Sequence, residues 1–201
     1  MYKTVVFDLD GTLLNTLTDL ADAGNRLCRK YSWPTHERQA YRYFVGNGIP
    51  KLVERLAPAD QRTPAVLEAA LADFKRDYGQ HLRDTTAPYP GIPEMLAKLK
   101  ANGVQLAVFS NKADALAKEV VKDYFGTQYF TIVRGQMTGV APKPAAEGTN
   151  ALLQALHADP ASTLYVGDSN VDVETAHNAN LPCCGAVWGF RTREELNAAG
   201  A

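Results

Sequence analysis

The apolar residues of this chain are spaced in two different ways. Between residues 16 and 87 they recur every three or four positions, as they do in amphipathic helices. The positions with this spacing are Leu17, Leu20, Leu27 and Cys28, followed by Leu67, Leu71, Phe74, Tyr78 and Leu82. Elsewhere, short β-branched and apolar runs alternate with helical stretches. The pattern therefore predicts an all-helical segment inside an alternating α/β chain.

A parallel sheet is the expected centre of the alternating part. Past the turn-forming stretch 87–91, helices alternate with strands predicted at 104–109, 129–133, 163–166 and 184–188. The run 4–7 should join the same sheet, because one short strand cannot bury itself among helices. The predicted fold class is α/β, a Rossmann-like parallel sheet flanked by helices, built from 1–15 and 88–201. An all-helical cap domain is expected to be inserted at 16–87.

Composition excludes several classes of partner. The 201 residues are 46% hydrophobic and carry a formal net charge of -1, so no basic excess is available to follow a nucleic acid or an anionic membrane. No apolar run approaches the ~20 residues that span a bilayer, and the N-terminal run is too short for a signal peptide. We expect a cytoplasmic protein. Its three cysteines, Cys28, Cys183 and Cys184, lack metal-site spacing and are expected to be buried thiols.

Polar side chains gather where the predicted strands end. Ligands of open parallel sheets bind at the carboxyl ends of the strands, so these side chains are candidates for one site. They are Asp8 and Asp10 after the first strand, Ser110 and Asn111 after the second, Lys143 in the loop after the third, and Asp168 and Asp172 after the fourth. The sequence thus predicts that acids, a hydroxyl, an amide and an ammonium group converge.

This set of groups suits a metal ion and a phosphate. Crowded carboxylates repel one another unless a cation neutralises them, and hard oxygen ligands favour Mg2+. With the metal and Lys143 in place, the site would hold a phosphate dianion, and Ser110 and Asn111 would donate hydrogen bonds to its oxygens. Asp8 and Asp10 could then divide the work of nucleophile and proton donor. A small phosphorylated metabolite is the expected partner.

Four segments resemble the motifs of the haloacid dehalogenase-like hydrolases, in the same order. They are 7–13, 109–111, 142–144 and 167–172. The helical insertion resembles the small cap of the phosphoglycolate phosphatase-like branch, so the resemblance covers essentially the whole chain. It implies a haloacid dehalogenase-like core and a phosphatase that forms and hydrolyses an aspartyl-phosphate.

The resemblance also implies a role for each motif residue. Asp8 would be the nucleophile and a Mg2+ ligand, and Asp10 would be the general acid and base and bind the metal through its main-chain carbonyl. Asp168 would complete the protein's metal ligands. The remaining roles are phosphate binding by Ser110 with Asn111, charge balance by Lys143, shaping of the turn by Gly11 and Thr12, and orientation of Lys143 or of the metal's waters by Asp172.

Substrate choice is expected to lie in the cap. The turn Gly46-Asn47-Gly48 resembles the cap loop of phosphoglycolate phosphatases, and its main-chain N–H groups could meet a small carboxylate, with Arg42 supplying a cation. One departure stands at the cap entry, where Asn15-Thr16 replaces the family's usual Asp-Ser and removes one negative charge. This difference bears on cap motion or substrate choice.

Two other functions remain open from the sequence. Sugar phosphomutases of the same fold keep both acids, so the motifs do not separate hydrolysis from transfer to a sugar hydroxyl. A phosphate-responsive binding module would need Asp8 but no acid at Asp10 and no cap. Dehalogenation is disfavoured, because a carbon–halogen bond has no leaving oxygen for Asp10 to protonate.

Overall fold

The computed structural model describes all 201 residues and divides into two compact units. Residues Met1–Leu14 and Pro88–Ala201 form the first unit, and Asn15–Ala87 form the second. The first contains a parallel sheet between helices, and the second is helical apart from its ends. The fold class predicted from the sequence is confirmed.

The sheet of the first unit is built around β1 (Thr4–Phe7). All four residues of β1 are buried, which requires cover on both faces of the sheet. The other strands are β4 (Gln105–Ala113), β5 (Phe130–Gln136), β6 (Thr163–Gly167) and β7 (Cys183–Gly185). Their order is β5-β4-β1-β6-β7, and every pair is parallel. Phe7 pairs with Val108 and Val166, so the residues that follow it emerge level with the ends of both neighbours.

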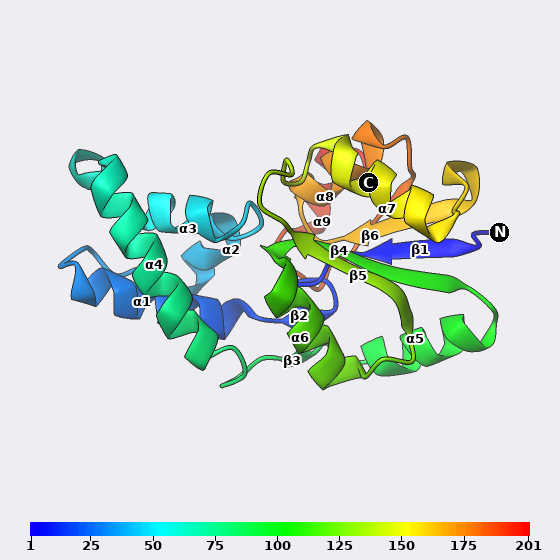
Figure 1. Cartoon of the computed structure of the whole chain (residues 1–201), viewed down its shortest axis with the longest axis horizontal. Helices are drawn as coiled ribbons and strands as arrows, with labels where there is room; N and C mark the ends of the chain where they lie inside the picture. Colours follow the sequence, from blue (N-terminus) through cyan, green and yellow to red (C-terminus); the bar gives the residue numbers. More distant parts are fainter. The chain divides into compact units, whose positions relative to one another are not determined.

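Helices cover both faces of this sheet (Figure 1). On one face lie α5 (Ile92–Ala101) and α6 (Asp114–Phe125); on the other lie α7 (Ala146–Leu156) and α8 (Asn170–Asn178). A short α9 (Arg193–Ala199) packs beside α8 and β7. Under α7 and α8 the core is a continuous buried cluster that includes Val6, Ala107, Leu152, Tyr165 and Ala176. Burial of this apolar surface is the main interaction that keeps the strands aligned in the sheet.

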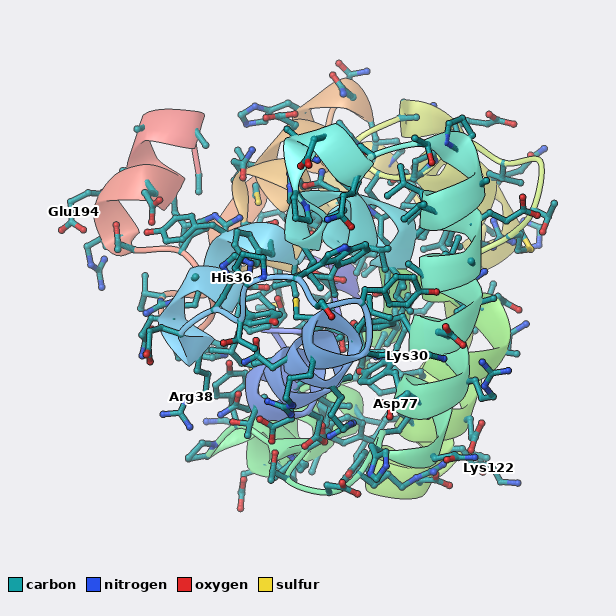
Figure 2. The ribbon with its side chains drawn as sticks, turned by 90° about the vertical axis from the view of Figure 1, so that its left-hand side faces the viewer. Lys30, His36, Arg38, Asp77, Lys122 and Glu194 are labelled. Atoms are coloured by element: carbon teal, nitrogen blue, oxygen red, sulfur yellow. The ribbon has the colours of Figure 1, made fainter.

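The second unit consists of four α-helices packed around their own core. They are α1 (Leu17–Lys30), α2 (Tyr41–Phe44), α3 (Ile49–Leu56) and α4 (Pro64–Gln80). Buried apolar side chains include Leu20, Leu27, Leu52, Leu56, Phe74 and Tyr78. Two ion pairs join α1 to α4, Arg26 with Asp77 at 2.7 Å and Lys30 with Asp73 at 2.6 Å; Lys30 and Asp77 are labelled in Figure 2.

The remaining elements are short. Two-residue strands β2 (Leu14–Asn15) and β3 (Ala87–Pro88) form a separate sheet. Single 3-10 turns lie at Arg38–Ala40, Ala59–Gln61 and Pro160–Ser162. No helix combines the length and the apolar character needed to cross a bilayer.

Three details differ from the sequence-based expectations. The last strand ends at Gly185 instead of reaching residue 188, because the chain then turns, with Gly189 N–H donating to the Ala186 carbonyl. The strand expected to end at residue 109 continues through Ala113, so that three polar residues, Ser110, Asn111 and Lys112, belong to the strand. Cys28 is buried as expected, but Cys184 is exposed on the edge strand β7.

The buried Asp19 of α1 binds the last residues of the helical unit through hydrogen bonds. It accepts hydrogen bonds from the main-chain N–H and the hydroxyl of both Thr85 and Thr86, at 2.5 to 2.9 Å. We predict that Asp19→Asn lowers the free energy of unfolding by about 1–3 kcal/mol, because an NH2 group would then face donors. Urea unfolding measures this. Asp22→Asn, at an exposed position of the same helix, is the matched control, and equal stability of the two variants would contradict the prediction.

Candidate active site

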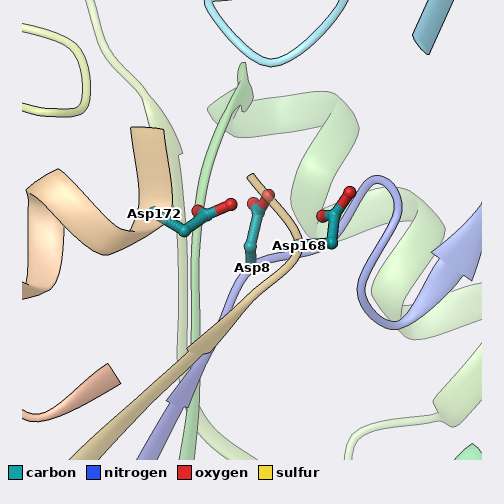
Figure 3. Close-up of side chains that lie close together, drawn as sticks. All are labelled: Asp8, Asp168 and Asp172. Carbon is teal, nitrogen blue, oxygen red and sulfur yellow. The ribbon is translucent and has the colours of Figure 1, made fainter. Parts of the chain in front are cut away.

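Three buried carboxylates meet at the carboxyl edge of the sheet. Asp8 follows β1, Asp168 follows β6, and Asp172 lies in the first turn of α8. Because β1 and β6 are parallel and in register, Asp8 and Asp168 leave the sheet at the same edge. Their ligand oxygens and that of Asp172 all lie within 4.8 Å of one another, and Figure 3 shows Asp8 between Asp172 and Asp168.

The Lys143 ammonium group lies inside this acidic cluster. Its Nζ is 2.9 Å from Asp8 Oδ1 and 2.7 Å from Asp172 Oδ1, and the lysine side chain is 2% exposed. Nζ also lies 3.3 Å from the Tyr165 hydroxyl and from the Phe109 carbonyl. A lysine so buried requires these partners, because removing an ammonium group from water costs several kcal/mol.

Asn111 positions the main chain of Lys143. The Lys143 N–H donates to Asn111 Oδ1 at 2.9 Å, and Asn111 Nδ2 donates to the Lys143 carbonyl at 3.2 Å. The contact of Asn111 with phosphate that we expect from the sequence remains a prediction. Its neighbour Ser110 accepts from Lys112 N–H at 3.2 Å, which leaves its O–H able to donate to a ligand.

Asp168 is oriented by two donors. Thr12 Oγ1 donates to Oδ1 and Phe190 N–H donates to Oδ2, both at 2.8 Å. Gly11, at φ +90°, packs so closely on this carboxylate that a Cβ would collide with it. Gly11 and Thr12 thus shape the turn around Asp168, while Phe190 contributes through its main-chain N–H.

Asp172 uses both of its oxygens within the protein. Oδ2 accepts from Ser169 Oγ at 2.6 Å and from Ser169 N–H at 3.1 Å, forming a capping box at the start of α8. Oδ1 pairs with Lys143. Of the two roles expected for Asp172, this geometry supports orientation of Lys143.

Burial and mutual repulsion shift the ionisation of the cluster. Burial first, then the charge of Asp172, raises the pKa of Asp8 to about 7, although Lys143 opposes the shift. Burial, with the charges of Asp172 and Asp8, raises the pKa of Asp168 well above its usual range. Burial alone would lower the pKa of Lys143, but Asp172 and Asp8 raise it well above its usual value. The cluster therefore holds more negative charge than one ammonium group can balance.

A divalent cation fits this surplus of negative charge. Buried Asp8 Oδ1 has no hydrogen-bond donor of suitable geometry, and all the candidate side-chain ligand atoms are carboxylate oxygens, which Mg2+ prefers. Asp8 and Asp168 would hold the metal: Asp168 accepts one hydrogen bond at each oxygen, whereas Asp172 accepts two at Oδ2 and pairs with Lys143 through Oδ1. The expected ligation by the Asp10 main-chain carbonyl remains a prediction.

The carboxylate of Asp10 is paired with a lysine that the sequence analysis did not single out. Lys112 Nζ lies 3.1 Å from Asp10 Oδ1 and 3.3 Å from Oδ2. Ser110 and Lys112 are two residues apart on β4, and the Lys112 N–H donates to Ser110 Oγ at 3.2 Å. The lysine directly follows Ser110-Asn111 in the sequence, and this adjacency was the available signal.

The helical unit carries the turn predicted to choose the substrate. Gly46 and Gly48 have φ of +108° and +82°, which glycine adopts without strain, and Gly48 precedes α3. Arg55 of α3 holds the turn, donating to the Phe44 carbonyl at 2.8 Å and to Asn47 Oδ1 at 2.9 Å. Arg42 lies in α2. The sequence analysis missed Arg55.

Family comparison identifies this arrangement. A sequence model described as haloacid dehalogenase-like hydrolase matches residues 5–186. The chain belongs to the haloacid dehalogenase-like hydrolases. The resemblance of its four motifs to this family is thereby confirmed, and the acidic cluster described above contains residues of the first and fourth motifs.

Individual relatives of this haloacid dehalogenase-like hydrolase carry a more specific name. A phosphoglycolate phosphatase of Thiobacillus denitrificans is 30% identical over 191 residues, covering 94% of this chain and 84% of the relative. One from Neisseria meningitidis serogroup A is 32% identical, covering 94% and 81%. A crystal structure from Lactobacillus delbrueckii subsp. bulgaricus, provisionally described as a phosphoglycolate phosphatase, has a TM-score of 0.93 at 28% identity, covering 100% and 92%.

The raised pKa of Asp8 predicts how Mg2+ binding depends on pH. Below about 7 the carboxyl group holds a proton that the metal must displace, and above it the carboxylate is ionised and repelled by its neighbours. Both effects make Mg2+ more stabilising at high pH. The Mg2+-induced rise in Tm should therefore be larger at pH 8 than at pH 6.

Differential scanning fluorimetry at the two pH values measures this difference. Asp8→Asn keeps the shape of the side chain but removes its titration, so the difference between the two pH values should be smaller in that variant. An equal or larger Mg2+ effect at pH 6 in the unmodified protein would contradict the prediction.

Proposed function

We propose that this protein is a Mg2+-dependent phosphatase that hydrolyses a small phosphomonoester through an aspartyl-phosphate on Asp8. The observation that carries the proposal is the buried Lys143 ammonium group, which lies 2.9 Å from Asp8 Oδ1. Asp168 and Asp172 are held by hydroxyl and main-chain N–H donors, whereas Asp8 Oδ1 accepts no hydrogen bond from a donor of either kind. Asp8 is the acid of the cluster that is left available for reaction.

Each residue contributes a separate part of the reaction. The Asp8 carboxylate attacks phosphorus, while Lys143 balances negative charge on Asp8 and on the phosphoryl oxygens. Ser110 donates a hydrogen bond to one of those oxygens. Asp10 gives a proton to the leaving oxygen and afterwards removes one from the water that hydrolyses the intermediate.

The metal would be held by Asp8, Asp168 and the Asp10 main-chain carbonyl. When bound, Mg2+ supplies positive charge that brings the phosphate dianion to the acidic cluster and stabilises the transferring group. The donors from Thr12 and Phe190 fix the orientation of the Asp168 carboxylate.

The proposed substrate class is a small phosphomonoester with its own carboxylate, 2-phosphoglycolate first. Two observations support it: the relatives with this name at about 30% identity, and the glycine turn held by Arg55 in the helical unit. We propose that main-chain N–H groups of Gly46, Asn47 and Gly48, together with Arg42, recognise the carboxylate.

A turnover screen tests the proposed reaction. Purified protein with Mg2+ should release inorganic phosphate from at least one member of a panel of 2-phosphoglycolate, sugar phosphates, nucleoside monophosphates and an aryl phosphate. Asp8→Asn should lower kcat/KM by at least about 10³-fold, since it removes the nucleophile. Interconversion of sugar phosphate isomers without net release would instead identify a phosphomutase, and no turnover of any compound would contradict both.

A second prediction concerns the carboxylate of the substrate. Arg42→Met should raise KM for 2-phosphoglycolate about tenfold or more, because a charged hydrogen bond is worth about 1.5–3 kcal/mol, while KM for an uncharged aryl leaving group should change little. Arg38→Met is the matched control, since Arg38 lies exposed four residues earlier (Figure 2). Equal changes in KM for the two substrates would contradict recognition of the carboxylate by Arg42.

A further inference from the structure

We propose that Lys112 is a positioning residue that holds the Asp10 carboxylate in its catalytic orientation. The inference rests on the proposed function, in which Asp10 transfers protons. It assigns to the reaction a second lysine, distinct from Lys143, that lies on another segment of the chain and contacts another carboxylate.

The contact is close and symmetrical. Lys112 Nζ lies 3.1 and 3.3 Å from the two Asp10 oxygens, so rotation of the carboxylate in either direction would weaken the pair. The lysine side chain is 2% exposed, whereas that of Asp10 is 21% exposed. The fixed, buried partner is thus the lysine, and the carboxylate it holds remains accessible.

The main chain around Asp10 is fixed independently. The Leu9 carbonyl accepts hydrogen bonds from the N–H groups of Thr12, Leu13 and Leu14, which close the turn that carries Asp10. This turn sets the position of the Asp10 Cα but not the direction of its carboxylate. Lys112 supplies that remaining constraint, and small errors in the direction of a proton donor cost much of its effect.

Stability alone is a weak explanation for this pair. A buried ion pair is often no more stable than two apolar side chains of the same volume, so a structural role would not require these charges.

The charge balance of the site is a further reason to assign Lys112 a role in the reaction. The four carboxylates Asp8, Asp10, Asp168 and Asp172 exceed the two ammonium groups Lys112 and Lys143 by two formal charges, which one divalent cation neutralises. Without Lys112 an uncompensated charge would remain to repel phosphate.

The experiment compares substrates that differ in their need for a proton. An alkyl phosphate such as 2-phosphoglycolate has a poor leaving group that must be protonated, whereas 2,4-dinitrophenyl phosphate does not. Lys112→Met should lower kcat/KM for the alkyl phosphate about tenfold or more, a part of the 10²–10⁴-fold that general acid catalysis supplies. For the aryl phosphate, kcat/KM should stay within about threefold, while hydrolysis of the intermediate slows and a burst of dinitrophenol appears.

Two further variants separate positioning from damage to the fold. Lys112→Arg keeps the charge and should recover much of the alkyl phosphate activity. In the double variant Asp10→Asn with Lys112→Met, the activity should equal that of Asp10→Asn alone, since Lys112 would act only through Asp10. This double variant leaves neither charge of the pair without its partner, so it remains informative even if Lys112→Met alone does not fold. Lys118→Met, in an exposed ion pair of α6, is the control.

The outcomes are distinct. Equal losses with both substrates, or an additional loss when Lys112→Met is added to Asp10→Asn, would overturn the inference while the proposed phosphatase stands. Failure of the unmodified protein to hydrolyse these two compounds and every other phosphate ester of the panel would instead contradict the proposed function, and the inference with it.

Discussion

The arrangement at the sheet edge depends on one buried ammonium group. Lys143 Nζ lies within 2.9 Å of both Asp8 and Asp172, and neither the lysine nor these acids could be buried at acceptable cost without the other. Asn111 fixes the lysine's main chain and Ser169 fixes its partner Asp172. Asp8 Oδ1 has the Lys143 ammonium group beside it but accepts no hydrogen bond from a hydroxyl or a main-chain N–H. Of the two carboxylates beside Lys143, Asp8 is therefore the one that the protein's own hydrogen bonds leave available to a ligand.

The parallel sheet explains how residues so distant in sequence come together. Register between β1 and β6 places Asp8 beside Asp168, and β4 on the other side of β1 supplies Ser110 and Lys112. Hydrophobic burial under α7 and α8 keeps these strands level. At this edge the negative charge of the carboxylates exceeds the positive charge of the lysines by an amount that one divalent cation neutralises. Once the cation is bound, the site can also hold a phosphate, so both kinds of binding depend on the same excess of carboxylates.

Much of this could be predicted from the sequence, because strand ends in a parallel sheet share one edge. That rule, with the hydrophobic pattern, placed Asp8, Lys143 and Asp168 near one another, and the structure brings them together. It could not predict Lys112, whose direction depends on β4 continuing past the expected strand end. It also could not predict the donation from Phe190, because a main-chain N–H has no sequence signature.

The central claim is that Asp8 receives the phosphoryl group. Acid quenching during turnover of a cleaved substrate, followed by peptide mass spectrometry, tests it directly, because low pH preserves an acyl phosphate. The account predicts a transient mass increase of one phosphoryl group on the peptide containing Asp8, and none in Asp8→Asn. A phosphoryl group on a different residue, or turnover of Asp8→Asn at the rate of the unmodified protein, would contradict it.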